Sequence, residues 1–191
     1  ADYLSFLGSD DVPIDPELYK DALVIIFDTA TEERISNSYY NTAKEIIKID
    51  HHIEKNPYGN IRWVEDWRSS TCEMLVYFYQ TFKNELKINK NAAKLLFAGI
   101  VADTDRFSKK ATTGDTLRFA AALLDIGIDT ENLYSNLYLK DFERFKFQSY
   151  VYDKIQVTPN GLVYLYVDDE MKKKFNLTNE NFFRGINSYF N

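Results

Sequence analysis

Cysteine is nearly absent from this sequence, and long apolar runs are missing. A single cysteine, Cys72, excludes an intramolecular disulfide framework and favours a reducing compartment. Runs such as LVIIF and LLFAGIVA are far shorter than the ~20 apolar residues that a membrane span needs. No basic-then-apolar signal sequence opens the chain. We therefore expect a cytoplasmic protein with no membrane partner.

Cationic side chains are outnumbered by acidic ones. The 23 Lys and Arg residues stand against 29 Asp and Glu residues, which gives a formal net charge of -6. This balance argues against a broad basic surface for duplex DNA, but it leaves room for a local anion pocket whose charge is met by metal ions. The 191 residues are 45% hydrophobic, which is enough for a packed core, and their number suits one full domain plus part of another.

Three short apolar segments predict buried strands, and helical patterns follow them. The strand segments are residues 23–28, 45–50 and 61–66, and a polar segment at 36–44 is compatible with a helix. The helical patterns cover residues 70–82, 89–102, 113–126 and 130–153. Ser69 or Ser70 is a candidate N-cap, with Glu73 at capping-box spacing from Ser70. Strands that alternate with helices predict an α/β fold with a mostly parallel sheet flanked by helices.

The character of the chain changes near residue 154. IQVTPNGLVYLYV alternates apolar and polar residues around Asn160-Gly161, which predicts a hairpin with a two-residue turn. We expect a first domain at 1–130, a helical linker at 131–154, and the start of a second, α+β domain at 155–191. The aromatic stripe of the linker region is expected to be core packing; its members are Tyr134, Tyr138, Phe142 and Phe145.

Both histidines of the chain follow directly on an acid that closes a predicted strand. Asp28 and Asp50 end strands, His51 and His52 come next, and Asp103 follows the apolar helix. Ligands of open α/β sheets bind at the carboxyl ends of strands, so these side chains are candidates for one site. Clustered carboxylates repel one another, and divalent cations relieve that repulsion. Mixed Asp and His ligands suit Mn²⁺, Fe²⁺, Co²⁺ or Zn²⁺.

Each of these residues, taken alone, has a more ordinary interpretation. A strand-terminal Asp is more often a helix cap or a turn former, and adjacent histidines are more often surface or packing residues. Cys72 has no further histidine to pair with, so packing is its expected role. The argument for a site therefore rests on the set and not on any single member.

The set occurs in three motifs whose order resembles the DHH family of metal-dependent phosphoesterases. These are FDTA at 27–30, IDHH at 49–52 and GIVADTDRF at 99–107. The KIDHH, NPYG and SSTCEM stretches and the later hairpin are similar to the DHH–DHHA1 group, which degrades very short RNAs and dephosphorylates 3′-phosphoadenosine 5′-phosphate. The resemblance implies that 1–130 is the DHH domain and that 155–191 begins a DHHA1 substrate-binding domain.

The resemblance also implies roles for single residues. Asp28 matches an aspartate that bridges two Mn²⁺ ions, and His51 and Asp103 match ligands of one of those ions. His52 matches the histidine that faces the scissile phosphate. Asp50 is then expected to orient an imidazole from outside the ligand shell. Short RNA or a small nucleotide is the implied substrate, and a homodimer is left open.

The sequence departs from the family pattern in three places. A first motif with a His and two spaced aspartates is absent, as is a late GGGH motif, and Asp105 stands where relatives commonly have Gly. We therefore expect the 191 residues to be part of a longer protein and to be inactive alone. Two other interpretations stay open, namely a cyclic-dinucleotide phosphodiesterase and a non-catalytic nucleotide-binding module.

Overall fold

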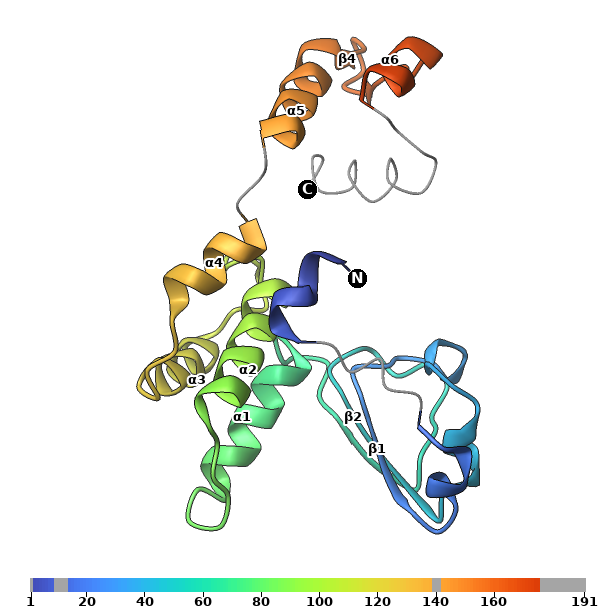
Figure 1. The fold of residues 1–191 in the computed structure, drawn as a ribbon, viewed down its shortest axis with the longest axis vertical. Helices are drawn as coiled ribbons and strands as arrows, with labels where there is room; N and C mark the ends of the chain where they lie inside the picture. The colour runs from blue at the N-terminus through green and yellow to red at the C-terminus, as the bar shows by residue number, and fades with distance from the viewer. Residues whose placement is uncertain (1, 9–13, 139–141, 176–191) are drawn as a thin grey trace. The chain divides into compact units, whose positions relative to one another are not determined.

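The computed structural model describes residues 2–8, 14–138 and 142–175. The chain divides into two compact units, Ala1–Leu137 and Tyr138–Asn191 (Figure 1). The predicted domain boundaries at 130/131 and 154/155 stay predictions. Among the described residues, no helix combines the length and the apolarity that crossing a bilayer requires.

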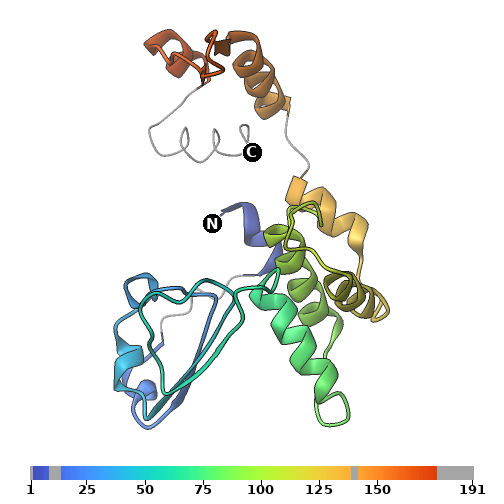
Figure 2. The ribbon, with the colours of Figure 1, turned by 180° about the vertical axis from the view of Figure 1, so that it is seen from behind.

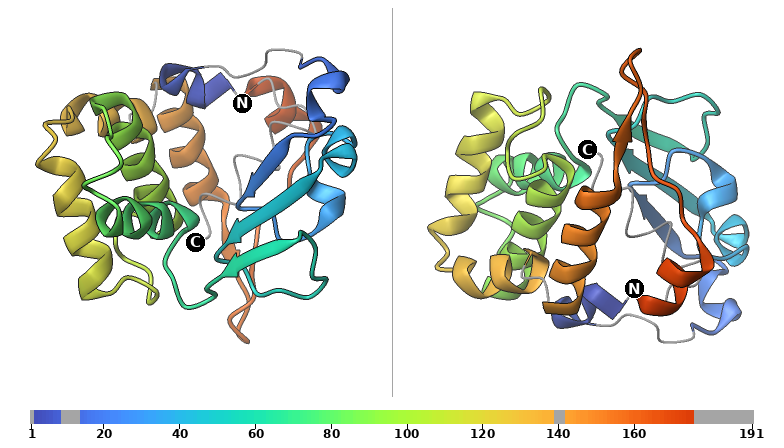
Figure 3. Two further views of the ribbon diagram at one scale, coloured as in Figure 1. Left: turned by 90° about the horizontal axis from the view of Figure 1, so that it is seen from below. Right: turned by 90° about the horizontal axis from the view of Figure 1, so that it is seen from above.

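The first unit contains a parallel three-stranded sheet in the order β1-β2-β3 (Figure 3). Strand β1 is Leu23–Phe27, β2 is Glu45–Asp50 and β3 is Ile61–Val64. Phe27 pairs with Ile49, which pairs with Trp63 on its other side, so the strands end together at one edge. The predicted α/β class and parallel sheet are confirmed.

The connection from β1 to β2 contains no α-helix, so the helix expected at 36–44 is wrong. Two short 3₁₀ helices stand there instead, η3 Glu32–Arg34 and η4 Tyr39–Thr42. Polar side chains bond to the nearby backbone: the Tyr39 N–H donates to Asn37 Oδ1 at 2.9 Å, and Thr42 Oγ1 donates to the Tyr39 carbonyl at 2.8 Å. Such local bonds compete with a regular helix. Two further 3₁₀ helices precede β1, η1 Asp2–Leu7 and η2 Pro16–Tyr19.

Three α-helices follow the sheet and pack on one another (Figures 1 and 2). They are α1 Thr71–Thr81, α2 Lys90–Asp103 and α3 Gly114–Leu124, with Ser70, Asn89 and Thr113 as their N-caps. Their shared core is formed by buried apolar side chains, which include Met74, Val76, Phe97, Ile100, Val101, Phe119 and Leu123. The predicted cap at Ser70 is confirmed, since its hydroxyl accepts from the Glu73 N–H at 3.0 Å.

The Glu73 side chain does not close the expected capping box on Ser70. It is buried and accepts from Ser69 Oγ at 2.5 Å, from Thr116 Oγ1 at 2.8 Å and from Arg68 Nη1 at 3.1 Å. A buried carboxylate needs several donors, and these come from both α3 and the loop before α1. Glu73 therefore ties the start of α1 to α3.

Helices α1 and α2 approach most closely where Cys72 faces Gly99. A Cβ atom added at Gly99 would lie 2.2 Å from Cys72 Sγ and 3.1 Å from its Cβ. Glycine is thus required by space at this position. Burial, with smaller contributions from Asp103 and Asp28, raises the pKa of the Cys72 thiol to about 12. The thiol is protonated at neutral pH, which fits its expected role in packing.

Helix α4 (Thr130–Tyr138) closes the first unit, and Tyr134 packs edge-on against Phe97. The second unit contains α5 Phe142–Lys154, the strands β4 Gln156–Val157 and β5 Val163–Tyr164, and α6 Asp169–Lys174. Its core is formed by Phe147, Val151 and Met171.

Two expectations for this region are wrong in detail. Phe142 and Phe145 are 69% and 59% exposed, so these members of the aromatic stripe are not core. The antiparallel hairpin is confirmed, but its loop is longer than two residues: Thr158 N–H donates to the Leu162 carbonyl at 2.9 Å, and Gly161 N–H donates to the Thr158 carbonyl at 2.9 Å. Pro159 favours the first central position of an ordinary turn, and Gly161 then takes the positive φ of 81°.

Candidate metal centre

The carboxyl ends of β1 and β2 bring the predicted set together. Asp28 follows β1, and its N–H donates to the Ile49 carbonyl of β2 at 3.0 Å. Asp50 is the last residue of β2, so His51 and His52 start the loop at the same edge. Asp103 is the last residue of α2. Two strand ends and one helix end thus supply all five candidates.

His51 is held in the orientation of a metal ligand. Its Nδ1 lies 3.2 Å from the Arg68 carbonyl, an acceptor that fixes the proton on Nδ1. Its Nε2 is 3.5 Å from Asp28 Oδ1 and 3.8 Å from Asp103 Oδ2. A carbonyl that accepts from one ring nitrogen leaves the lone pair of the other nitrogen for a cation. The lone pair of Nε2 therefore points at two carboxylates.

Asp28 adopts a left-handed backbone conformation, with φ of 55°. Aspartate tolerates this region better than most residues do, and such geometry is concentrated at functional sites. Its Oδ1 accepts from Thr71 Oγ1, the first residue of α1, at 2.8 Å. The backbone turn and this bond together aim the carboxylate at His51.

His52 is bound to its own sequence neighbour. Its Nδ1 lies 2.7 Å from Asp50 Oδ1, and its backbone N–H donates to the same oxygen at 3.0 Å. Asp50 is fully buried, whereas the His52 side chain is partly exposed. A buried carboxylate that holds Nδ1–H leaves Nε2 for contacts outside the protein.

The site changes the pKa of the Asp103 carboxyl. Burial, with a further contribution from the neighbouring Asp28 carboxylate, raises its pKa, while His51 acts in the opposite direction. Two carboxylates that share an imidazole repel each other, and a cation between them would remove that repulsion. The electrostatics of the site thus favour a bound divalent ion.

The donors present fit a transition-metal ion. One ligand atom each from Asp28, His51 and His52 lies within 4.8 Å of the others. This grouping joins His52 to Asp28 and His51, while Asp103 contacts the group through His51. Carboxylate oxygen together with imidazole nitrogen suits Mn²⁺, Fe²⁺ or Zn²⁺ better than Ca²⁺. The predicted roles of these two residues, Asp103 as a metal ligand and His52 as the residue that faces the phosphate, stay predictions.

The loop after Asp103 contains three consecutive non-glycine residues at positive φ. Asp105, Arg106 and Phe107 have φ values of 43°, 60° and 66°. The buried Thr104 holds this turn, because its Oγ1 accepts from the Phe107 N–H at 2.9 Å and its carbonyl accepts from the Lys109 N–H at 3.0 Å. A glycine at position 105 would adopt φ of 43° without strain.

Comparison with known proteins identifies the family of the chain. A model of the DHH family, N-terminal domain, matches residues 2–100, which is more than half of the chain. The chain belongs to the DHH family. Within it, the chain is 36% identical over 176 residues to the bifunctional oligoribonuclease and PAP phosphatase NrnA of Bacillus subtilis, with 92% of this chain and 56% of that protein covered.

Other relatives show the same pattern. A probable bifunctional oligoribonuclease and PAP phosphatase NrnA of Streptococcus mutans is 37% identical, with 92% of this chain and 56% of that protein covered. The chain thus spans about half the length of the curated relatives it matches. An exopolyphosphatase-related protein of Bacteroides fragilis has the same fold, with a TM-score of 0.81 at 22% identity over 98% of this chain and 59% of that one.

Sequence reasoning missed three residues that support this DHH site. Thr71 bonds Asp28, the Arg68 carbonyl bonds His51, and Lys48 is buried beside Asp50. Thr71 and Arg68 stand in or beside the SSTCEM stretch, whose likeness to the family was the only available signal. Lys48 lies in the middle of a strand, where nothing in its neighbours signals burial of a cation.

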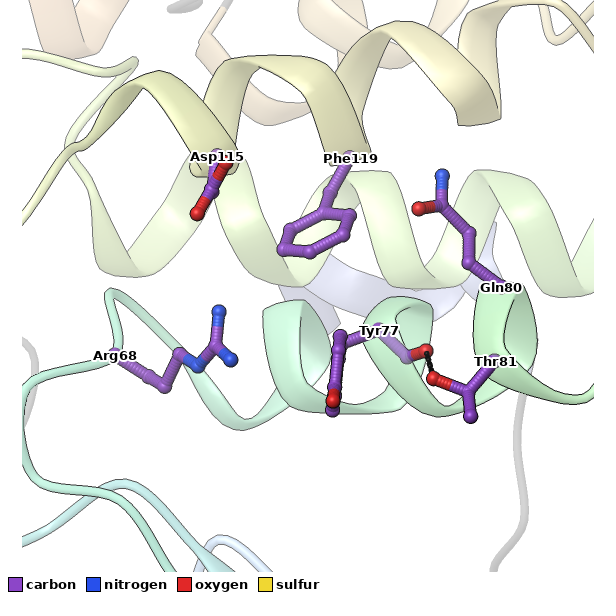
Figure 4. Close-up of a pocket in the computed structure, with 6 residues that line it drawn as sticks. All are labelled: Arg68, Tyr77, Gln80, Thr81, Asp115 and Phe119. Carbon is purple, nitrogen blue, oxygen red and sulfur yellow. Dashed lines mark hydrogen bonds between the residues drawn. The ribbon is translucent and has the colours of Figure 1, made fainter.

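One hollow of the first unit has a lining that shares no residue with the candidate metal centre. About 370 Å³ in volume, it lies between α1 and α3, where Figure 4 shows its lining of Arg68, Tyr77, Gln80, Thr81, Asp115 and Phe119. The Arg68 guanidinium lies 5.1 Å from the Tyr77 ring centroid and pairs with Glu65 and Glu73. These two carboxylates neutralise the Arg68 guanidinium, so Arg68 does not make the hollow an anion-binding site.

Proposed function

We propose that this chain is the catalytic part of a metal-dependent phosphoesterase that hydrolyses short oligoribonucleotides, 3′-phosphoadenosine 5′-phosphate, or both. The observation that carries the proposal is the His51 imidazole, with Nδ1 held by a backbone carbonyl and Nε2 directed at Asp28 and Asp103. The names of the Bacillus and Streptococcus relatives support the substrate class.

In this proposal, Asp28, His51 and Asp103 hold Mn²⁺, and His52 faces the scissile phosphate. When bound, divalent ions supply Lewis acidity, which acidifies water and offsets the charge of phosphoryl oxygens. Asp50 keeps the His52 proton on Nδ1, so that Nε2 is the atom that meets the substrate. Thr71 keeps the Asp28 carboxylate directed at His51.

Several finer points belong to the same proposal. The described residues offer one ligand cluster, and two Mn²⁺ ions are proposed for the whole protein. The 191 residues alone are proposed to be inactive, because one cluster supplies the ligands of one ion. A cytoplasmic location, the absence of duplex DNA as a partner, and a homodimer also stay proposals.

The test measures release of mononucleotides from a diribonucleotide with Mn²⁺, by the chain and by the protein at its full natural length. Loss of turnover in His52→Ala at full length is the expected result. Hydrolysis of a cyclic dinucleotide instead would support a metal-dependent phosphoesterase and overturn the proposed substrate class. No hydrolysis of either substrate, with no manganese in the purified protein, would overturn the proposal in favour of a binding module. Turnover by the 191 residues alone would overturn their proposed inactivity.

A further inference from the structure

Lys48 is a cation buried inside the sheet. It pairs with Ile26 of β1 and Arg62 of β3 in the strand register, and its side chain is 1% exposed. An ammonium group removed from water is costly unless it is paired and hydrogen-bonded. The partners of Lys48 therefore decide why a lysine is tolerated there.

Those partners lie at the candidate metal centre and in the loops around it. Lys48 Nζ is 3.6 Å from Asp50 Oδ2, 3.4 Å from Glu54 Oε1 and 3.3 Å from the Ala30 carbonyl. The Tyr58 ring centroid lies 4.4 Å away, and Tyr58 Oη donates to the Thr29 carbonyl at 2.5 Å. One ammonium thus stands between two carboxylates, one of which is Asp50.

The two oxygens of Asp50 have different partners. Oδ1 accepts both His52 contacts, while Oδ2 is buried and has no hydrogen-bond partner among the described residues. Lys48 is the cation that faces Oδ2. The torsion that turns a carboxylate is soft, so hydrogen bonds to one oxygen alone fix the group weakly. An ammonium beside the second oxygen fixes it from the other side, in surroundings where charges interact strongly.

We propose that Lys48 is a positioning residue for His52. By holding Asp50 Oδ2, it keeps Oδ1 directed at His52 Nδ1, and so keeps the imidazole proton on Nδ1 and Nε2 turned toward the substrate phosphate. The last clause rests on the proposed function, whereas the Lys48–Asp50–His52 chain of contacts does not. A merely structural Lys48 would instead fasten the loops through Glu54 and the Ala30 carbonyl, with no effect on the imidazole.

Nuclear magnetic resonance of the imidazoles separates these two roles. The chain has only His51 and His52, so four ring nitrogens give all the signals. We expect a slowly exchanging Nδ1 proton from His52 in the metal-free chain. Lys48→Met should lose this signal, and Asp50→Ala, which removes the acceptor altogether, should lose it as a positive control. Lys48→Arg should retain it, as should Glu54→Gln, which removes a structural partner of Lys48 and leaves Asp50 intact.

A second variant covers the case in which Lys48→Met does not fold. Lys48→Met/Glu54→Gln removes the ammonium together with one of its two carboxylates, and it should also lose the His52 signal while retaining that of His51. An unchanged His52 signal in either folded variant would overturn the proposal. Because no metal, substrate or turnover enters this measurement, its outcome is independent of the hydrolysis test.

Discussion

Replacement of Gly99 by alanine tests whether the close approach of α1 and α2 builds the site. The added Cβ would lie 2.2 Å from Cys72 Sγ, more than 1 Å inside ordinary contact, and 3.1 Å from Cys72 Cβ. Rotation of the thiol clears the first contact but not the second, so the helices must separate. Overpacking of this kind costs up to about 3 kcal/mol. Alanine regains about 1 kcal/mol as the better helix former.

The expected net loss in the free energy of unfolding is therefore about 2 kcal/mol. At roughly 2–4 °C per kcal/mol, the melting temperature of the first unit should fall by roughly 4–8 °C. Gly114→Ala is the matched control, because its nearest neighbour at 3.3 Å is the end of the exposed Arg118 side chain. Cys72→Ala/Gly99→Ala removes the sulfur but keeps the Cβ contact at 3.1 Å, so it should regain only part of the loss, as a double-mutant cycle can measure.

The same substitution should weaken metal binding. Gly99 lies about one turn before Asp103, and Cys72 follows Thr71, so separated helices move two supports of the site apart. Calorimetry with Mn²⁺ should show weaker binding by Gly99→Ala and partial recovery in the double variant. A Gly99→Ala chain that melts at or above the temperature of the unchanged chain would refute the argument from packing.

Three further outcomes are expected. Asp28→Asn should weaken Mn²⁺ binding at least about tenfold. The control is Asp21→Asn, which alters another left-handed aspartate at the opposite end of β1 and should leave Mn²⁺ binding unchanged. Equal affinities of the two variants in calorimetry would exclude Asp28 as a ligand. Asp103→Asn should stabilise the metal-free chain at neutral pH. Burial raises the pKa of Asp103, so the folded state binds the proton more tightly than the unfolded state does. The stability of the unchanged chain therefore falls as pH rises through that raised pKa, and asparagine removes this loss. The gain in melting temperature should disappear in acid, and a gain that is independent of pH would contradict this cause. Cys72 should resist alkylation at pH 8 until the chain unfolds, because its pKa is raised to about 12; rapid labelling of the folded chain, followed by mass spectrometry, would show that the thiol is accessible and ionised.

Local signals predict much of the fold. Strand β2 has the bounds that its apolar run and closing acid indicate, and Ser70 caps α1 as its spacing from Glu73 suggests. These features depend on residues within one turn or one strand. One failure occurs where a distant partner decides: Glu73 leaves the capping box because Thr116 of α3 reaches it.

The candidate site shows the same division. The residue types and their order at strand and helix ends are enough to indicate Asp28, His51 and Asp103. The contacts that orient them come from elsewhere in the chain, since Thr71 holds Asp28 and the Arg68 carbonyl holds His51. Alternation along β2 gives no sign that a lysine is buried, because two of its partners, the Glu54 carboxylate and the Ala30 carbonyl, lie in loops that only the folded chain brings near.

The left-handed run after Asp103 has a consequence for substitution at position 105. Glycine at position 105 would relieve the strain of the folded turn, but it would also enlarge the unfolded ensemble, and the two effects on stability oppose each other. Exchange between Asp and Gly there is therefore close to neutral for folding. The exchange removes the Asp105 carboxylate, which lies two residues after Asp103 and is paired with Arg106 at 3.0 Å in this chain. Position 105 is thus a place where a substitution can change the local electrostatic potential with little effect on the scaffold.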